Sequence, residues 1–178
     1  MFDTKFFLNL KKKNYIKSLD LIKKAYDFSK SKHAGQYRDD GKDYFTHPME
    51  VAEILSNMGL DSPSIITALL HDVVEDSTVT IQDIKKLFGL EISKLVDGVT
   101  KLTKIELKFG LAQAENFRKL LISSSDDIRV LLVKLADRLH NIRTIEGIKD
   151  KRRQIKICTE TLEIYVPLAE RLLSLIHI

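Results

Sequence analysis

The amino-acid sequence predicts an all-α fold, with roughly eight helices in a single domain. Seven glycines and three prolines among 178 residues are too few for the many tight turns of an all-β chain. Apolar residues recur at intervals of three and four, the period of an amphipathic helix, and no segment shows a convincing strand pattern. With 44% hydrophobic and 30% charged residues, the chain can form a core and is expected to fold as one domain.

The ends of the early helices follow from their proline, glycine and capping residues. Pro48 suits the first turn of one helix, and Gly59 suits its end. The next helix begins at Asp61 or Ser62 with Pro63, and because it is apolar on most faces we expect it at the centre of the fold. In order, the expected helices span about 14–32, 48–59, 61–74, 80–89, 91–102, 111–123, 128–145 and 150–173.

Later boundaries rest on other local signals. The polar segment AGQYRDDGKDY after the first helix predicts a loop. Thr80 with Asp83 resembles a capping box, and SSSDD offers N-caps for helix 128–145. Gly98 is expected to interrupt its helix, and the polar segment KLTKIELKFG that follows predicts a mobile loop. Pro167 predicts a kink or break in the last helix.

Composition excludes several classes of function. No apolar run approaches the roughly 20 residues of a membrane span, and the start MFDTKFFLNLKKK has no secretory cleavage site. The single cysteine, Cys158, excludes an internal disulfide framework and a thiolate metal cluster, and it agrees with a cytoplasmic location. Since the net charge is only +4, the lysines between Lys11 and Lys32 are expected to form a solvated helix face and not a nucleic-acid site.

Polar residues on otherwise apolar helices carry the chemical signal, because burying an unpaired charge is costly. They form three clusters: His47 at a helix start; His71 and Asp72 with Glu75 and Asp76 one turn further in HDVVED; and Asp137, Asn141 and Thr144 on one helix face. Taken singly, each is better explained as a cap, a satisfied core group or a surface residue. Jointly they favour a metal site of imidazole and carboxylate ligands, which suits Mn, Fe, Zn or Ni.

Six segments occur in order along the chain: HAGQYRDDGKDYFTHP, ALLHDVVEDS, FGLEISKLVDGVTKL, AENFRKLL, IRVLLVKLADRLHNIRT and ETLEIYVPLAERL. Together they resemble the hydrolase domain of the RelA/SpoT homologues, the enzymes that make and degrade the alarmone (p)ppGpp. The resemblance covers residues 25–172 and implies an HD-domain phosphohydrolase fold.

The resemblance also implies a cofactor and a reaction. One Mn²⁺ ion would be bound by His47, His71, Asp72 and Asp137. Glu75 and Asp76 would be catalytic, orienting or deprotonating the attacking water, and pyrophosphate would leave the 3′ position of (p)ppGpp to give GDP or GTP. A divalent ion that polarises water and a carboxylate that accepts the proton lower the same barrier.

Substrate contacts are implied by the same resemblance. Arg38 and the loop around Tyr44 would border the guanine and the phosphates, and Arg38 suits either base stacking or phosphate binding. The remaining residues implied at the pocket are Lys134, Arg138, Asn141 and Thr144, although solvent exposure explains Lys134 equally well. The sequence departs from many relatives at Asp39 and Asp40, where small or basic residues are common. Two acids beside a polyanionic substrate put its affinity in doubt.

The hydrolase domain is expected to span residues 1–172 of an N-terminal fragment, since bifunctional relatives continue into synthetase and regulatory domains. Residues 173–178, LSLIHI, also read as the translation of CTGTCTCTTATACACATC, the end of a common sequencing transposon, and are expected to be a non-native tail. The alternative is the end of a hydrophobic terminal helix.

The expected partner is the guanine nucleotide (p)ppGpp, and neither a membrane nor a nucleic acid is expected. Two other functions stay open at this point. One is an HD phosphohydrolase acting on a different nucleotide, and the other is a truncated domain that binds nucleotide without turnover.

Overall fold

Helices make up most of the protein in the computed structural model, which describes residues 2–14, 16–108 and 127–176. In chain order the elements are α1 (Phe2–Lys11), α2 (Leu19–Lys32), α3 (Thr46–Asn57), α4 (Ser62–Leu70), α5 (Val73–Asp76), α6 (Ile81–Phe88), α7 (Leu90–Lys108), α9 (Ile128–Arg143), the 3-10 turn η2 (Ile145–Gly147), α10 (Lys151–Glu160), the π-helical segment η3 (Thr161–Tyr165) and α11 (Val166–Ile176). Within these ranges, extended pairing is confined to an isolated bridge between Tyr37 and Asp43. The all-α prediction is confirmed.

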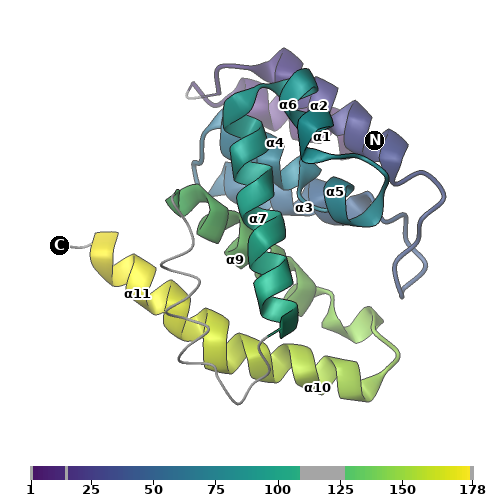
Figure 1. The fold of residues 1–178 in the computed structure, drawn as a ribbon, viewed down its shortest axis with the longest axis vertical. Coiled ribbons are helices and arrows are strands. Elements are labelled where there is room, and N and C mark those ends of the chain that lie inside the picture. The colour runs from purple at the N-terminus through teal and green to yellow at the C-terminus, as the bar shows by residue number, and fades with distance from the viewer. Residues whose placement is uncertain (1, 15, 109–126, 177–178) are drawn as a thin grey trace.

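Helix α4 lies at the centre of the fold, as its sequence predicts. It packs against α2, α3, α7 and α9, and each of its residues except Pro63 is buried. Asp61 caps it by accepting a hydrogen bond from the Ser64 N–H at 3.0 Å. Burial stabilises the fold by about 1.5–3 kcal/mol for each large apolar side chain, and α4 contributes four of them: Ile65, Ile66, Leu69 and Leu70. In Figure 1, α7 crosses in front of α4 while α10 and α11 follow one another along the bottom.

The helix predicted over 61–74 is interrupted at His71 and Asp72. Helix α4 ends just before them and the one-turn α5 starts just after. Nδ1 of His71 bonds the Ala68 carbonyl at 2.7 Å, the acceptor that a continuing α-helix would offer to the Asp72 N–H. Apolar periodicity continues across this turn, so the sequence pattern does not reveal it. The turn places His71 and Asp72 at the end of the central helix.

Helix α7 is longer than the sequence predicts and continues without interruption. It runs without a break from Leu90 to Lys108, so the expected interruption at Gly98 is wrong. The expected loop over 101–110 is wrong for its described residues, 101–108. A Cβ on Gly98 would lie 2.9 Å from Cγ2 of Val130 on α9. The glycine therefore allows α7 and α9 to approach closely. The helix predicted over 111–123 lies outside the described residues.

The N-terminal helix α1 is not predicted by the sequence pattern. Its side chains Phe6 and Leu10 are buried, and the Phe7 ring lies edge-on to Tyr26 of α2 at 5.3 Å between centroids. Helix α2 begins at Leu19, several residues later than expected. Elsewhere the local signals are confirmed by the structure: the Thr80 and Asp83 capping box, the Asp127 N-cap within SSSDD, and the positive φ of Gly59 after α3.

Pro167 does not break the last helix. A proline has no N–H for the carbonyl four residues earlier, and its ring presses on that carbonyl. Here the chain widens into the π turn η3, which ends at Tyr165, and then continues as α11 with Pro167 in its first turn. Helix α11 also includes residues 173–176. Among the described helices, none has the length and apolarity to cross a membrane.

Candidate metal centre and cavity

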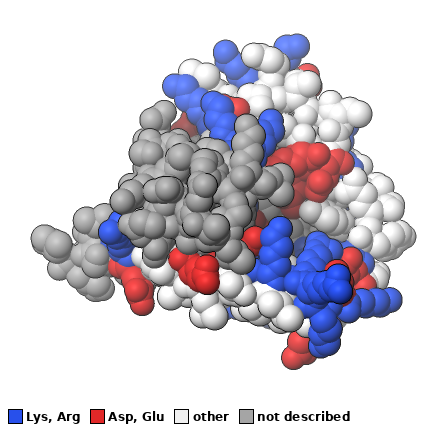
Figure 2. All heavy atoms as spheres, turned by 60° about the horizontal axis from the view of Figure 1, so that its bottom comes forward, with Lys and Arg blue, Asp and Glu red and all other residues white. Residues whose placement is uncertain are grey.

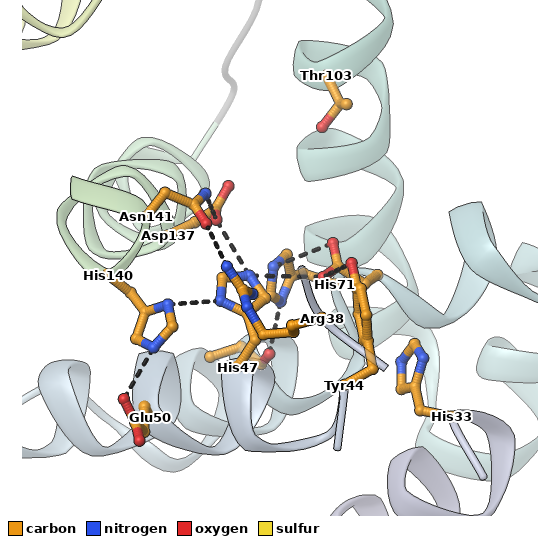
Figure 3. A network of polar contacts seen from close by, with 12 residues as sticks. His33, Arg38, Tyr44, His47, Glu50, His71, Thr103, Asp137, His140 and Asn141 are labelled. Carbon is orange, nitrogen blue, oxygen red and sulfur yellow. Dashed lines mark hydrogen bonds and ion pairs between the residues drawn. The ribbon is translucent and has the colours of Figure 1, made fainter. Parts of the chain in front are cut away.

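Two histidines and two aspartates from three separate segments meet beside the central helix. His47 comes from the first turn of α3, His71 and Asp72 from the turn between α4 and α5, and Asp137 from α9. Nε2 of His47 lies 3.2 Å from Oδ1 of Asp137 and 3.5 Å from Oδ2 of Asp72, and Nε2 of His71 lies 3.1 Å from Oδ1 of Asp72. One ligand atom each from His47, His71 and Asp137 lies within 4.8 Å of the others, and Figure 3 shows their side chains converging.

His71 is held in the form that binds a cation. Because its Nδ1 bonds a carbonyl oxygen, that nitrogen carries the proton and Nε2 of the neutral ring carries the lone pair. Nε2 is buried and has no hydrogen-bond partner among the described residues. Burial lowers the pKa of His71, but the carboxylates of Asp72 and Asp137 outweigh it and leave the pKa raised, so the surroundings favour a positive charge at Nε2, which a metal ion can supply in place of a proton. A lone pair facing carboxylates calls for a cation, so these residues fit a divalent metal ion.

Neighbouring side chains hold the two candidate carboxylate ligands in place, and those around Asp137 also keep it ionised. Burial raises the pKa of Asp137, but Lys134 and His47 overcome it and hold this pKa well below its usual range. Nζ of Lys134 lies 3.1 Å from Oδ2 of Asp137, and the Asn141 amide donates to Oδ1 at 2.7 Å. On the other side, the Tyr44 hydroxyl donates to Oδ2 of Asp72 at 3.0 Å. Burial, then the nearby acids, raise the Tyr44 pKa, so the phenol keeps its proton.

Glu75 and Asp76, the two acids that end the segment HDVVED, differ in their position relative to the cavity. Glu75 lines the cavity beside the ligands. Burial is the main cause that raises the pKa of Glu75, Asp72 raises it further, and Lys134 lowers it. A raised pKa suits a carboxylate that accepts a proton near neutral pH. Asp76 does not line the cavity; its carbonyl accepts a hydrogen bond from the Gln36 amide, and its carboxylate lies near Tyr44.

A cavity of about 290 Å³ opens beside this cluster. It is lined by Tyr37, Arg38, Asp39, Asp40, Tyr44, His47, Asp72, Glu75, Thr103, Lys134, Asp137, Asn141, Thr144, Gly147, Ile148, Arg153 and Ile157. A larger cavity, of about 720 Å³, lies between α7 and the start of α9, away from the histidines. Metal-type ligands cluster only at the smaller cavity in the part of the chain that the structure describes.

Most of the predicted substrate residues are brought to this cavity. Arg38 donates to Oδ1 of Asn141 at 3.2 Å, which fixes its guanidinium over the cavity wall. Lys134 is buried and not solvent-exposed, and Tyr44, Asn141 and Thr144 also line the space. Arg138 is not brought there. Because it follows Asp137 by one residue, its side chain leaves α9 about 100° around the helix axis from that of Asp137. There its guanidinium lies 3.2 Å from the Glu160 carboxylate and 4.3 Å from the centre of the Tyr165 ring.

The acids that depart from many relatives are paired locally. Asp39 binds Nη1 of Arg153 on α10 at 2.7 Å, and Asp40 lies 3.3 Å from Nζ of Lys42. A Cβ on Gly147 would come within 2.9 Å of the Asp40 Cβ, so η2 closes tightly over this loop. Their charges are thus partly offset at the rim of the cavity.

The sequence pattern missed two residues behind His47: His140, which contacts it, and Glu50, which contacts His140. His140 and His47 bring their Nδ1 atoms within 2.7 Å, and Nε2 of His140 lies 2.8 Å from Oε2 of Glu50. Burial and His47 lower the pKa of His140 to about 4. The missed signal is a shared spacing, since Glu50 follows His47 by three residues on α3 and His140 follows Asp137 by three on α9.

Residues 25–173 match the HD domain family. Among similar proteins, a GTP pyrophosphokinase from Myxococcus xanthus is 52% identical over 158 residues, covering 86% of this chain and 21% of that protein. The bifunctional (p)ppGpp synthase/hydrolase SpoT of Escherichia coli is 50% identical over 153 residues, covering 85% of this chain and 22% of that protein. The guanosine-3′,5′-bis(diphosphate) 3′-pyrophosphohydrolase of Aquifex aeolicus is 46% identical over 159 residues, covering 89% and 22%.

The chain therefore spans about a fifth of the length of these relatives. A solved structure, described as a metazoan ortholog of SpoT that hydrolyzes ppGpp, superposes with a TM-score of 0.68 at 27% identity, covering 83% of this chain and 85% of that one. Sequence, fold and ligand cluster agree: the chain belongs to the HD domain family and is a relative of the RelA/SpoT homologues.

Proposed function

We propose that this domain hydrolyses the 3′-pyrophosphate of (p)ppGpp, with one Mn²⁺ ion bound by His47, His71, Asp72 and Asp137. The observation that carries the proposal is the buried Nε2 of His71, which makes no hydrogen bond among the described residues and lies 3.1 Å from the Asp72 carboxylate. It lies beside a cavity that is lined by Glu75 and Lys134. The names of the similar proteins supply the substrate class. A cytoplasmic location, where guanine nucleotides are abundant, belongs to the same proposal.

When bound, the ion polarises water and neutralises phosphate charge. Glu75 accepts the proton as water adds to phosphorus, and its raised pKa suits that role. The bond from phosphorus to the ribose 3′ oxygen breaks, and the proton taken from water is returned to that oxygen as the 3′ hydroxyl forms, so pyrophosphate leaves and GDP or GTP remains. Tyr44 holds Asp72 in place, and Asn141 does the same for Asp137.

Basic groups suit the polyanionic substrate. Arg38 and Lys134 face the cavity from two sides. Figure 2 shows further Lys and Arg side chains gathered at the end of the molecule where α10 lies. The exposed basic residues of that stretch are Lys149, Lys151, Arg152, Arg153 and Lys156. Such a field raises the local concentration of an anionic ligand.

The test is a nucleotide assay on the purified protein. We expect ppGpp and Mn²⁺ to yield GDP and pyrophosphate, and Asp72→Ala to lose both metal binding and turnover because it removes a ligand. Lys23→Met, an exposed change on α2 far from the ligands, serves as the control. Turnover of another nucleotide but not ppGpp would move the function to a different HD phosphohydrolase. Binding of ppGpp without turnover would make the domain a nucleotide-binding module.

A further inference from the structure

Two side chains outside the ligand set form a chain behind His47. Nδ1 of His47 meets Nδ1 of His140 at 2.7 Å, and Nε2 of His140 meets Oε2 of Glu50 at 2.8 Å. Both imidazoles are about 3% exposed, while the Glu50 side chain is 44% exposed. In Figure 3 the chain runs from His47 through His140 to Glu50.

Only one arrangement of protons lets His47 bind a metal. Two imidazole nitrogens at 2.7 Å share a single hydrogen, because two hydrogens would collide and two lone pairs would repel. A metal at Nε2 of His47 needs the lone pair there, which puts the ring proton on Nδ1. His47 then donates to His140, whose own proton sits on Nε2 and is donated to the Glu50 carboxylate. The reverse arrangement would place a proton on Nε2 of His47, between it and Asp137.

We propose that His140 and Glu50 are positioning residues for the metal centre: Glu50 fixes the tautomer of His140, and His140 fixes that of His47. The inference rests on the proposed function only in taking His47 as a ligand. Hydrogen-bond partners behind a metal-bound imidazole set its orientation and its basicity. Glu50 also satisfies an Nε2–H of His140 that is otherwise buried, and burying such a donor without a partner is costly.

The helices make this chain rigid. His47 and Glu50 lie one turn apart on α3, and Asp137 and His140 lie one turn apart on α9, so each helix supplies one ligand and one backing residue. Helices α3 and α9 pack directly against each other. Any shift between them would change both the ligand distances and the backing contacts together.

The experiment compares Glu50→Ala with Glu53→Ala, a matched change three residues further along the same helix that does not touch His140. Titration calorimetry with MnCl₂ gives the metal affinity. Long-range ¹⁵N–¹H NMR spectra of the metal-free proteins give the tautomer of His47. We expect Glu50→Ala to weaken Mn²⁺ binding by about 10–100-fold and to mix the His47 tautomers. Glu53→Ala should leave both unchanged, and Glu50→Gln, whose amide oxygen still accepts from His140, should fall between.

Two results would overturn the inference. One is a Glu50→Ala protein that binds Mn²⁺ like the wild type and keeps the proton of His47 on Nδ1. The other is an equal loss in Glu53→Ala, which would assign the effect to helix α3 and not to the chain. If the wild type binds no Mn²⁺, the proposed function fails, and the tautomer spectra of the metal-free proteins then decide the inference alone. Melting temperatures of the variants in EDTA distinguish a folding defect from lost positioning.

Discussion

Lys134→Met should destabilise the metal-free protein strongly and make its stability more dependent on metal. Lys134 is buried, and its ammonium lies 3.1 Å from the Asp137 carboxylate and 3.3 Å from the Thr103 hydroxyl. Methionine keeps the length of the side chain and removes the charge. Removing one partner of a buried ion pair costs about 3–5 kcal/mol. Because Asn141 and His47 still contact Asp137, we expect the lower end, about 3 kcal/mol.

The assay is thermal unfolding with EDTA or with MnCl₂. For a domain of this size about 3 kcal/mol corresponds to a fall in melting temperature of roughly 6–12 °C. A ligand at 100 times its Kd stabilises the folded state by about 2.7 kcal/mol. The rise on adding Mn²⁺ should be larger in the variant than in the wild type, since Lys134 no longer repels the ion. Lys23→Met removes an exposed lysine paired with Asp27 and should change the free energy of unfolding by less than about 0.5 kcal/mol.

A Lys134→Met protein whose melting temperature in EDTA matches the wild type within about 2 °C would contradict this role of Lys134. An equal rise in melting temperature of both proteins when Mn²⁺ is added would contradict it too. In either case Lys134 would not be the cation that keeps Asp137 ionised before the metal binds.

Three further outcomes follow from the structure. Glu75→Gln should keep Mn²⁺ affinity while kcat for ppGpp falls by about 10²–10⁴-fold, and an unchanged kcat would remove Glu75 from proton transfer. Asp39→Asn should release Arg153 from its ion pair and lower KM for ppGpp by roughly two- to tenfold at low salt. This effect should shrink at higher salt, which screens the attraction between Arg153 and the nucleotide. An unchanged KM would show that Arg153 does not reach the substrate. Hydrogen bonding to Arg129 lowers the pKa of Asp127, so this carboxylate contributes stability above its ordinary pKa and loses it as pH falls through the folded-state value. The difference between the urea midpoints of wild type and Asp127→Asn at pH 7 should therefore shrink as the pH falls below the ordinary aspartate pKa, and a constant difference would contradict the assigned cause.

Much of the fold could be predicted because helix signals are local. Pro63 with Asp61, the Thr80 and Asp83 pair, and Asp127 each act within one turn of their own helix, and each lies where expected. The sequence predictions were wrong where a contact between residues distant in sequence determines the local structure. Gly98 indicates a break by its propensity, but α9 lies against it and uses the missing Cβ.

The same distinction between local signals and distant contacts applies to the candidate site. Residue type and spacing were enough to select four candidate ligands, since a His-Asp pair within an apolar helix has few structural explanations. The structure groups three of them, His47, His71 and Asp137, within 4.8 Å of one another. Spacing alone could not separate Arg138 from its neighbour Asp137, because only the packing of α10 shows that Arg138 faces Glu160. Glu50 was overlooked because a half-exposed acid on a helix is ordinary until its partner across the interface is known.

The π turn η3 changes which face of the helix points toward the core between α10 and α11. None of the α10 side chains is buried, whereas α11 buries Leu168 and Leu172. A π turn holds one more residue than the corresponding α turn, so it rotates the face that follows by about 100°. Deleting one residue from Thr161–Tyr165 would restore α geometry and swing Arg153 and Ile157 off the cavity rim. The extra residue of the π turn thus lets one continuous helical segment line the cavity at one end and the hydrophobic core at the other.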